Sequence, residues 1–188
     1  MSLIARSIAG CLVVLAFASN AQALSDAQKT TIRTFACADT ATARPMVLAG
    51  DTESLRAWLN ATGTFVVWRT NVTNDELGDA MNGTEVTGLS SLNMQRLQVL
   101  AAYSGGSQNM SRADRRAAFD GVFSGAGGTI TRASMAVIWK RNAARAEQAL
   151  ATGTGSTAVP GTMTFEGQVS GPDVSTMVYT DSGVLRGC

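Results

Sequence analysis

Apolar residues recur at intervals of three and four along most of this chain, which is the spacing of one face of an α-helix. The first such segment begins at Ser25, where Ser25 and Gln28 have the spacing of a capping box. The pattern predicts that Ile32 and Phe35 point inward and that the helix ends near Cys37.

Four further helices are predicted before the last third of the chain, and one of them begins at a second capping box, formed by Thr73 and Glu76. Glycines follow the apolar runs and mark the expected ends. The predicted bounds and inward residues are 51–63 with Leu55, Trp58 and Leu59; 73–83; 89–103 with Leu89, Leu92, Val99, Leu100 and Tyr103; and 111–123 with Ala117, Phe119 and Phe123.

The longest helix is predicted from about Thr131 to Thr152. Within it, Arg141 and Arg145 are four residues apart and should point in the same direction. Its apolar face would contain Met135, Ile138, Trp139, Ala146, Ala149 and Leu150.

Two segments read as strands instead. Residues 64–70 are β-branched and aromatic, and residues 162–167 alternate between apolar and polar side chains. We expect these two segments to pair as a two-stranded ribbon, and a last short helix to begin at Ser170. The predicted fold class is therefore mainly α with a small two-stranded β element, in a single compact helical domain whose core includes Trp58, Trp68, Ile138 and Trp139.

Residues 1–23 have the form of a secretory signal. Arg6 precedes an apolar run from Ile8 to Ala18, and the small residues Ala21 and Ala23 follow a polar break. The run is too short for a stable membrane span, which needs roughly 20 apolar residues. Residues 24–188 would then be the single mainly helical domain, although a start assigned too far upstream gives the same pattern.

The charge balance argues against a nucleic-acid partner. The chain has 15 basic and 14 acidic residues, so without Arg6 the remaining part is neutral. A neutral surface lacks the basic patch that binds phosphates or an anionic membrane. An apolar share of 45% is ordinary for one globular domain with one core.

The absence of histidine removes the commonest general base and metal ligand, so we expect no catalytic residue, no metal site and no cofactor. Cys37 and Cys188 are too few to hold zinc without other ligands. In an oxidising compartment they could form a disulfide that stabilises the fold by about 4–5 kcal/mol, and in a reducing one they would stay free thiols.

Three polar features could bind an anion or act as catalytic acids. Gly125–Thr131 precedes a helix start where an anion could bind, but it lacks the lysine of a phosphate-binding loop. Glu166, in an apolar strand, is expected to pair with Arg69 or Arg145. The acids of a short helix start, Asp75, Glu76 and Asp79, are favoured there by the helix dipole and need no catalytic role.

The segments VWRTNV (67–72) and IWKRNAARAEQALATGTGSTAVPGTMTFEG (138–167) resemble a largely uncharacterised family of small structural proteins of tailed bacteriophages and prophages. The resemblance covers about residues 25–173, and the relatives begin near the equivalent of Ala23. It implies a virion structural or assembly protein, most plausibly at the neck or tail, and no catalytic residues.

Two functions therefore stay open. In the first, the protein is a non-enzymatic virion component assembled in the host cytoplasm, bound to other virion proteins in a ring or multimer. In the second, it is a small periplasmic or secreted binding domain closed by a Cys37–Cys188 disulfide. The predicted partner-contact residues are the arginines of two helix faces, Arg112, Arg115, Arg116, Arg141 and Arg145.

Overall fold

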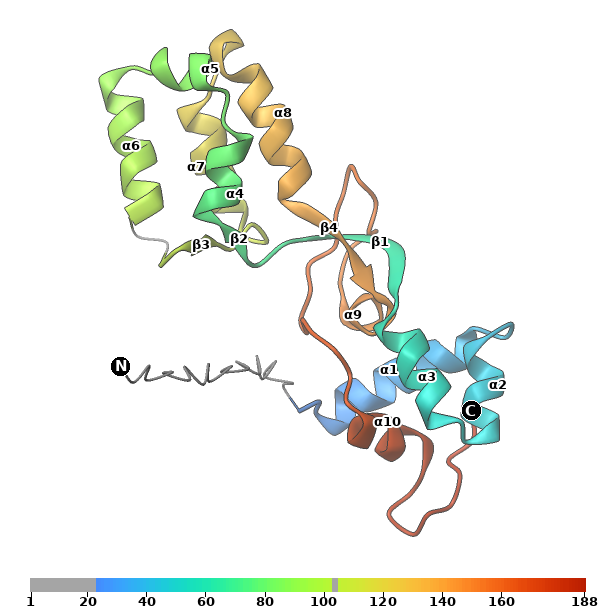
Figure 1. Cartoon of the computed structure of the whole chain (residues 1–188). Coiled ribbons are helices and arrows are strands. Elements are labelled where there is room, and N and C mark those ends of the chain that lie inside the picture. The colour runs from blue at the N-terminus through green and yellow to red at the C-terminus, as the bar shows by residue number, and fades with distance from the viewer. Residues whose placement is uncertain (1–22, 103–104) are drawn as a thin grey trace, which may run out of the picture.

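The computed structural model describes residues 23–102 and 105–188. The signal-like segment, apart from Ala23, and Tyr103 lie outside the described residues. The described chain forms two helical lobes joined by a β-ribbon (Figure 1). We call the lobe that carries the first described residues and the C-terminus the terminal lobe, and the lobe formed by residues 72–139 the inserted lobe.

The terminal lobe is built from segments far apart in sequence. α1 begins at the predicted capping box, in which the Ser25 side chain accepts from the Gln28 N–H and the Gln28 side chain accepts from the Ser25 N–H. Its helices are α1 (Asp26–Ala38), α2 (Ala43–Ala49), α3 (Thr52–Asn60), α9 (Arg145–Leu150) and α10 (Gly171–Val178).

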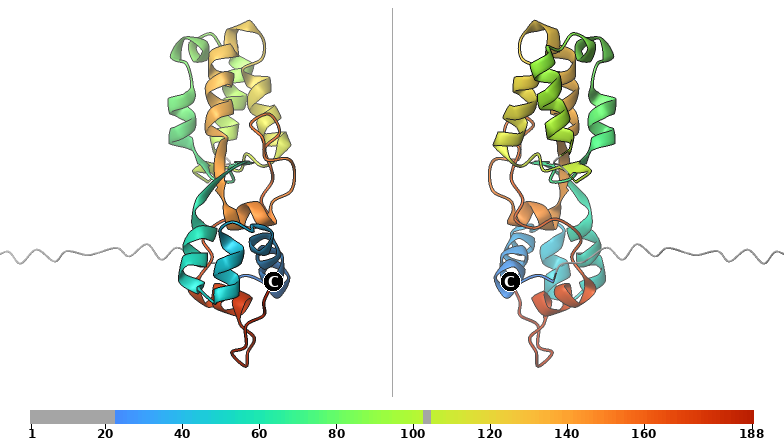
Figure 2. Two further views of the ribbon diagram at one scale, coloured as in Figure 1. Left: turned by 90° about the vertical axis from the view of Figure 1, so that its right-hand side faces the viewer. Right: turned by 90° about the vertical axis from the view of Figure 1, so that its left-hand side faces the viewer.

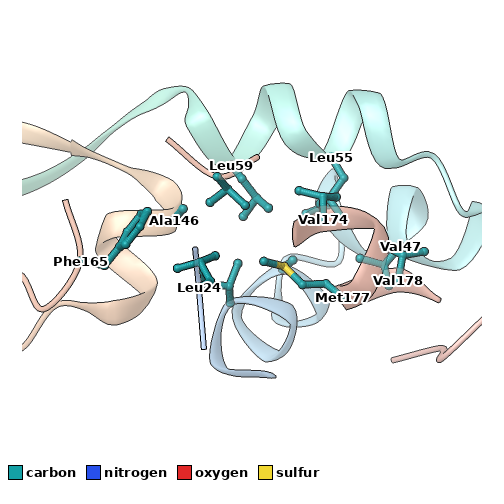
Figure 3. Packing of buried hydrophobic residues seen from close by; sticks show 13 residues of the cluster. Leu24, Val47, Leu55, Leu59, Ala146, Phe165, Val174, Met177 and Val178 are labelled. Carbon is teal, nitrogen blue, oxygen red and sulfur yellow. The ribbon is translucent and has the colours of Figure 1, made fainter. Parts of the chain in front are cut away.

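The core of the terminal lobe lies where α1, α3, α9 and α10 meet (Figure 3). Leu24, Leu59, Ala146 and Phe165 approach one another at one end of this core, and Val47 and Val178 lie at the other. Leu59 is fully buried and Phe165 only 4% exposed. Half-buried Trp58 packs against this cluster, in agreement with its predicted core role.

The inserted lobe begins at the second predicted capping box, which the Thr73 and Glu76 side chains form at the start of α4. α4 packs against α8 and α6 against α7, and β2 pairs with β3 in a short antiparallel ladder. Its elements are β2 (Val72–Thr73), α4 (Asn74–Ala80), α5 (Gly83–Thr87), α6 (Ser91–Ala102), β3 (Ser107–Gln108), α7 (Ala113–Val122), the 3₁₀ turn η1 (Ala126–Gly128) and α8 (Thr129–Ile138).

The inserted lobe has its own core, so the expected single core is divided into two clusters. The predicted core residue Trp139 is 4% exposed, and Trp68 and Ile138 pack against the same cluster. Two predicted core residues of α6 are instead exposed, Leu92 by 57% and Val99 by 54%. The remaining buried members are Val72, Leu77, Leu97, Met110, Phe119, Val122, Phe123 and Met135.

The ribbon between the lobes pairs β1 (Thr62–Trp68) with β4 (Lys140–Ala144) in antiparallel register, with Trp68 opposite Lys140. The predicted long helix 131–152 is therefore wrong, because it is divided into α8, β4 and α9. Helical spacing holds within α8 and within α9, but β1 offers its unpaired backbone groups to the segment between them.

The predicted partner of β1 was also wrong. Residues 162–167 form no strand with β1: Thr162 makes one isolated bridge, to Thr152, and it is the preceding Gly161 that bridges Val67 of β1. The fold class is nevertheless confirmed, since the described chain is mainly helical with a small two-stranded antiparallel element. Within the described residues, no helix combines the length and apolarity that crossing a bilayer requires.

Candidate functional site

The segments that carry the sequence resemblance meet where β1 contacts β4 and the loop that follows α9. The Val66 N–H donates to the Gly155 carbonyl at 2.7 Å, and the Gly161 N–H donates to the Val66 carbonyl at 2.8 Å. The Trp68 N–H donates to the Gly161 carbonyl at 3.0 Å. We call this place the junction, and define it as residues 65–70, 140–147 and 152–167.

Two glycines of the junction enclose the ring of Phe65. A Cβ atom on Gly155 would lie 2.1 Å from Phe65 Cδ2, and one on Gly161 would lie 2.5 Å from Phe65 Cε1. Gly155 also has a φ of +65°, which favours glycine. Gly155 and Gly161 thus allow the loop after α9 to pack closely against Phe65 of β1.

An ion-pair network holds the junction to α9. Two hydrogen bonds, of 2.7 and 2.8 Å, join the Arg141 guanidinium to the buried carboxylate of Glu147. The same guanidinium donates to Glu166 at 3.0 Å, and Thr70 donates to Glu166 from the other side. The expected partners of Glu166, Arg69 or Arg145, were therefore wrong, because the strand pairing of β4 places Arg141 beside it.

Backbone donors complete the surroundings of Glu147. The Ala144 N–H donates to this carboxylate at 2.8 Å and the Gly167 N–H at 3.0 Å. Burial raises the pKa of Glu147, but the hydrogen bonds from Arg141 and from these two N–H groups outweigh it and hold the pKa below its ordinary value. Glu147 therefore stays charged and acts as a fixed anchor between β4 and α9.

A second pair connects β1 to the inserted lobe. Arg69 donates to both carboxylate oxygens of Glu76, at 2.8 and 3.0 Å, and also to the Ile138 carbonyl at 3.1 Å. The hydrogen bond from Arg69, followed by that from the Thr73 N–H, lowers the pKa of Glu76 to about 2. The first and the last helix of the inserted lobe, α4 and α8, are thereby tied to one arginine.

The arginines predicted to contact partners are mostly occupied within the chain. Arg141 and Arg145 do not share a helix face, because Arg141 lies in β4; Arg145 stacks 4.9 Å over Trp58 and donates to its carbonyl. Arg116 stacks 3.8 Å over Trp68 and donates to the Met110 carbonyl.

On the same helix, the exposed Arg112 pairs with Asp114 at 2.6 Å, while Arg115 is half-exposed. The two basic faces expected from the sequence are therefore not formed as such, and α7 keeps only a mixed-charge surface at its start.

The helix start considered as an anion site already holds an anion of the chain. Glu85 accepts from the N–H of Ile130 at 2.9 Å and of Thr131 at 2.7 Å, at the beginning of α8. Its carboxylate satisfies two of the free donors of the first helical turn. Among the described residues, no three His, Cys, Asp or Glu side chains are placed to hold a metal ion.

The two cysteines of the described chain form a disulfide. Cys37 lies at the end of α1 and Cys188 at the C-terminus; they are 151 positions apart in sequence, with 5.5 Å between their Cα atoms. The bond closes the terminal lobe and fastens the segment after α10 to α1, as the oxidised alternative predicts.

Sequence reasoning missed the exposed apolar side chains of the inserted lobe. Leu92 and Val99 on α6, and Ile130 and Val137 on α8, are each more than half exposed. Each pair is seven residues apart, which places its members on one face of a helix. The spacing was visible in the sequence, but spacing alone cannot tell a core face from an outward one.

No protein-family model, curated protein or solved structure matches this chain.

Proposed function

We propose that this protein is a non-enzymatic structural or assembly component of a tailed-phage virion, at the neck or tail, and that it acts in several copies. The resemblance of residues 67–72 and 138–167 to phage structural proteins is the sequence basis of the proposal. Those residues lie in or beside the junction, where their polar groups form the hydrogen bonds and ion pairs that hold its segments together. This supports a role in shape and stability rather than in chemistry.

The observation that carries the proposal is the outward apolar surface of the inserted lobe. Val137 is 72% exposed and Ile130 57% exposed on α8, and α6 exposes Leu92 and Val99. Single exposed apolar residues are ordinary, but repeated ones on one helix face mark surfaces that other proteins cover. A component that works by contact with its neighbours in a particle needs such surfaces and no reactive centre.

The test is composition analysis of particles. Virions released from a host that carries this gene are banded on a density gradient and digested, and their proteins are quantified by mass spectrometry. The proposal expects peptides of this chain in the virion band at a fixed ratio to the major capsid protein, unchanged by a high-salt wash. Their absence from the band, with the chain present in the host periplasm, would overturn it.

The second candidate, a small periplasmic or secreted binding domain, is favoured by one observation. Cys37 and Cys188 are joined, and such bonds persist mainly in oxidising compartments. Its test is the intact mass of the native product without reductant. A chain that begins at Leu24 and is two hydrogens light supports export, whereas free thiols in a cytoplasmic product support the virion role.

A further inference from the structure

α8 carries an apolar stripe on its outward face. Met135 on the inner face of this helix is fully buried, whereas Ile130 and Val137 on the other face are 57% and 72% exposed. Ala133 lies between them at helical spacing and is also exposed. We call Ile130, Ala133 and Val137 the α8 stripe. A hollow beside it, between α8 and α4, is lined by Glu76, Asp79, Ala80, Ser134, Val137 and Ile138.

A complementary groove lies between α6 and α7. Its volume is about 540 Å³, and Arg96 is the one charged side chain among the described residues that line it. We call it the α6–α7 groove. The small residues of α7 leave its floor open, while Leu92 and Val99 form its outer wall; the lining consists of Leu92, Gln95, Arg96, Val99, Leu100, Ala117, Ala118 and Gly121.

The charges beside the two surfaces are opposite. Two carboxylates line the hollow next to the α8 stripe: Glu76 is already paired with Arg69, and Asp79 supplies the negative charge there, whereas the α6–α7 groove has the guanidinium of Arg96. α6 and α8 lie on opposite sides of the inserted lobe (Figures 1 and 2). One molecule can therefore present both surfaces to two neighbours at once.

We infer that the α6–α7 groove binds the α8 stripe of a second copy of this chain. The stripe supplies an apolar helix face for the groove, and Asp79 of one copy would face Arg96 of the next. Because the two surfaces differ, the contact is head-to-tail, and repetition gives a ring if the rotation closes and a filament if it does not. The inference deepens the proposed function and rests on its multimeric part.

The experiment measures the molar mass of the purified full chain by light scattering during size exclusion, over a series of concentrations. Val137→Glu disables the stripe and Val99→Glu disables the groove, and both positions are exposed, so the fold should survive. Leu48→Glu is the matched control, because Leu48 is 52% exposed on α2 in the other lobe. Far-ultraviolet circular dichroism and the melting temperature of each variant verify that it is folded.

We expect the wild type and Leu48→Glu to form multimers, and each valine variant to associate at least about tenfold more weakly. Mixing Val137→Glu with Val99→Glu should restore one intact contact per pair and give a 1:1 dimer that grows no further. Any of three results would overturn the interface. The wild type could stay monomeric, or the multimer could persist in both variants. The third is a mixture that stays monomeric when each single variant is a monomer.

The same variants separate this interface from the virion role. If Val137→Glu abolishes the multimer but the chain is absent from virions, the interface stands and the proposed function is overturned. If peptides of this chain are found in virions but the purified multimer is unaffected by both valine substitutions, the interface is overturned and the proposed function stands.

Discussion

Arg141 and Glu147 form a bidentate ion pair across the boundary between β4 and α9, at 2.7 and 2.8 Å. The Glu147 side chain is 5% exposed and that of Arg141 is 30% exposed. The pair lies at the point where the chain changes from strand to helix, and Glu166 from the following loop binds the same guanidinium. One arginine therefore fixes the positions of three segments relative to one another.

Arg141→Ala should destabilise the fold by about 3–5 kcal/mol, because it leaves the Glu147 carboxylate buried without its cationic partner. Urea unfolding followed by circular dichroism measures the free energy. The control is Arg56→Ala, which breaks the exposed pair with Glu53 and should cost no more than about 1 kcal/mol. Equal losses in the two variants would contradict the role of burial.

A related expectation concerns Glu147 itself. Glu147→Gln keeps the shape of the side chain but removes the charge that binds Arg141 and the Ala144 and Gly167 N–H groups. We expect it to cost less than Arg141→Ala, since no uncompensated buried charge remains. A greater loss than that of Arg141→Ala would show that the carboxylate is the main anchor of the loop after α9.

The capping boxes show which part of this fold the sequence could predict. The boxes at Ser25 and Thr73, and the Asp51 cap of α3, each depend on residues within one helical turn, so local sequence determines them. The division of residues 131–152 could not be predicted in this way. It depends on pairing with β1, which lies more than 70 positions earlier in the chain.

The exposed apolar surface of α6 could not be predicted for a different reason. Helical spacing places Leu92 and Val99 on one face of α6, and an apolar face at this spacing predicts core packing. The structure turns Leu97 of the same helix inward instead, at 9% exposure. α6 has apolar residues on two sides, so periodicity cannot choose between them without knowing where α7 packs. Arg116 and Arg145 stack on Trp68 and Trp58, which lie far away in sequence, so helical spacing alone could not predict these contacts.

Acid should destabilise the protein in a defined range. The pKa of Glu76 is lowered from 4.5 to about 2, and that of Glu147 is also below its ordinary value. The unfolded chain therefore binds more protons than the folded one in this range, so stability is complete above about pH 5 and falls as the pH drops toward 2. Urea midpoints measured from pH 7 to pH 2 test this expectation.

Glu76→Gln is the control for the acid effect. It removes one of the carboxyl groups whose pKa is lowered by folding, so its stability should fall less steeply than that of the wild type between pH 5 and pH 2. The change should be modest because the Glu76 side chain is 38% exposed and water screens its pair with Arg69. Parallel curves for the two proteins would contradict the assignment.

Gly155→Ala should destabilise the junction. The added methyl would meet the Phe65 ring at a backbone φ of +65°, so either Phe65 moves or the loop does. We expect a loss of about 1–3 kcal/mol, in the range for overpacked sites. Gly78→Ala is the matched control: it lies within α4 with nothing near its Cβ position, and should stabilise slightly because alanine favours helices. Thermal melts compare them, and a neutral Gly155→Ala would overturn the packing argument.

Removal of the disulfide should affect the terminal lobe first. The Cys37–Cys188 bond closes a loop of 151 positions, for which the chain-entropy estimate gives about 4–5 kcal/mol. The double variant Cys37→Ser/Cys188→Ser avoids a free thiol and should unfold at a lower urea concentration than the oxidised wild type. A reductant should lower the urea midpoint of the wild type to that of the double variant and leave the midpoint of the variant unchanged. Hydrogen exchange should increase most in residues 179–188, which the bond fastens to α1, and least in α7 and α8. Equal increases in both lobes would show instead that the bond stabilises the chain only as a whole.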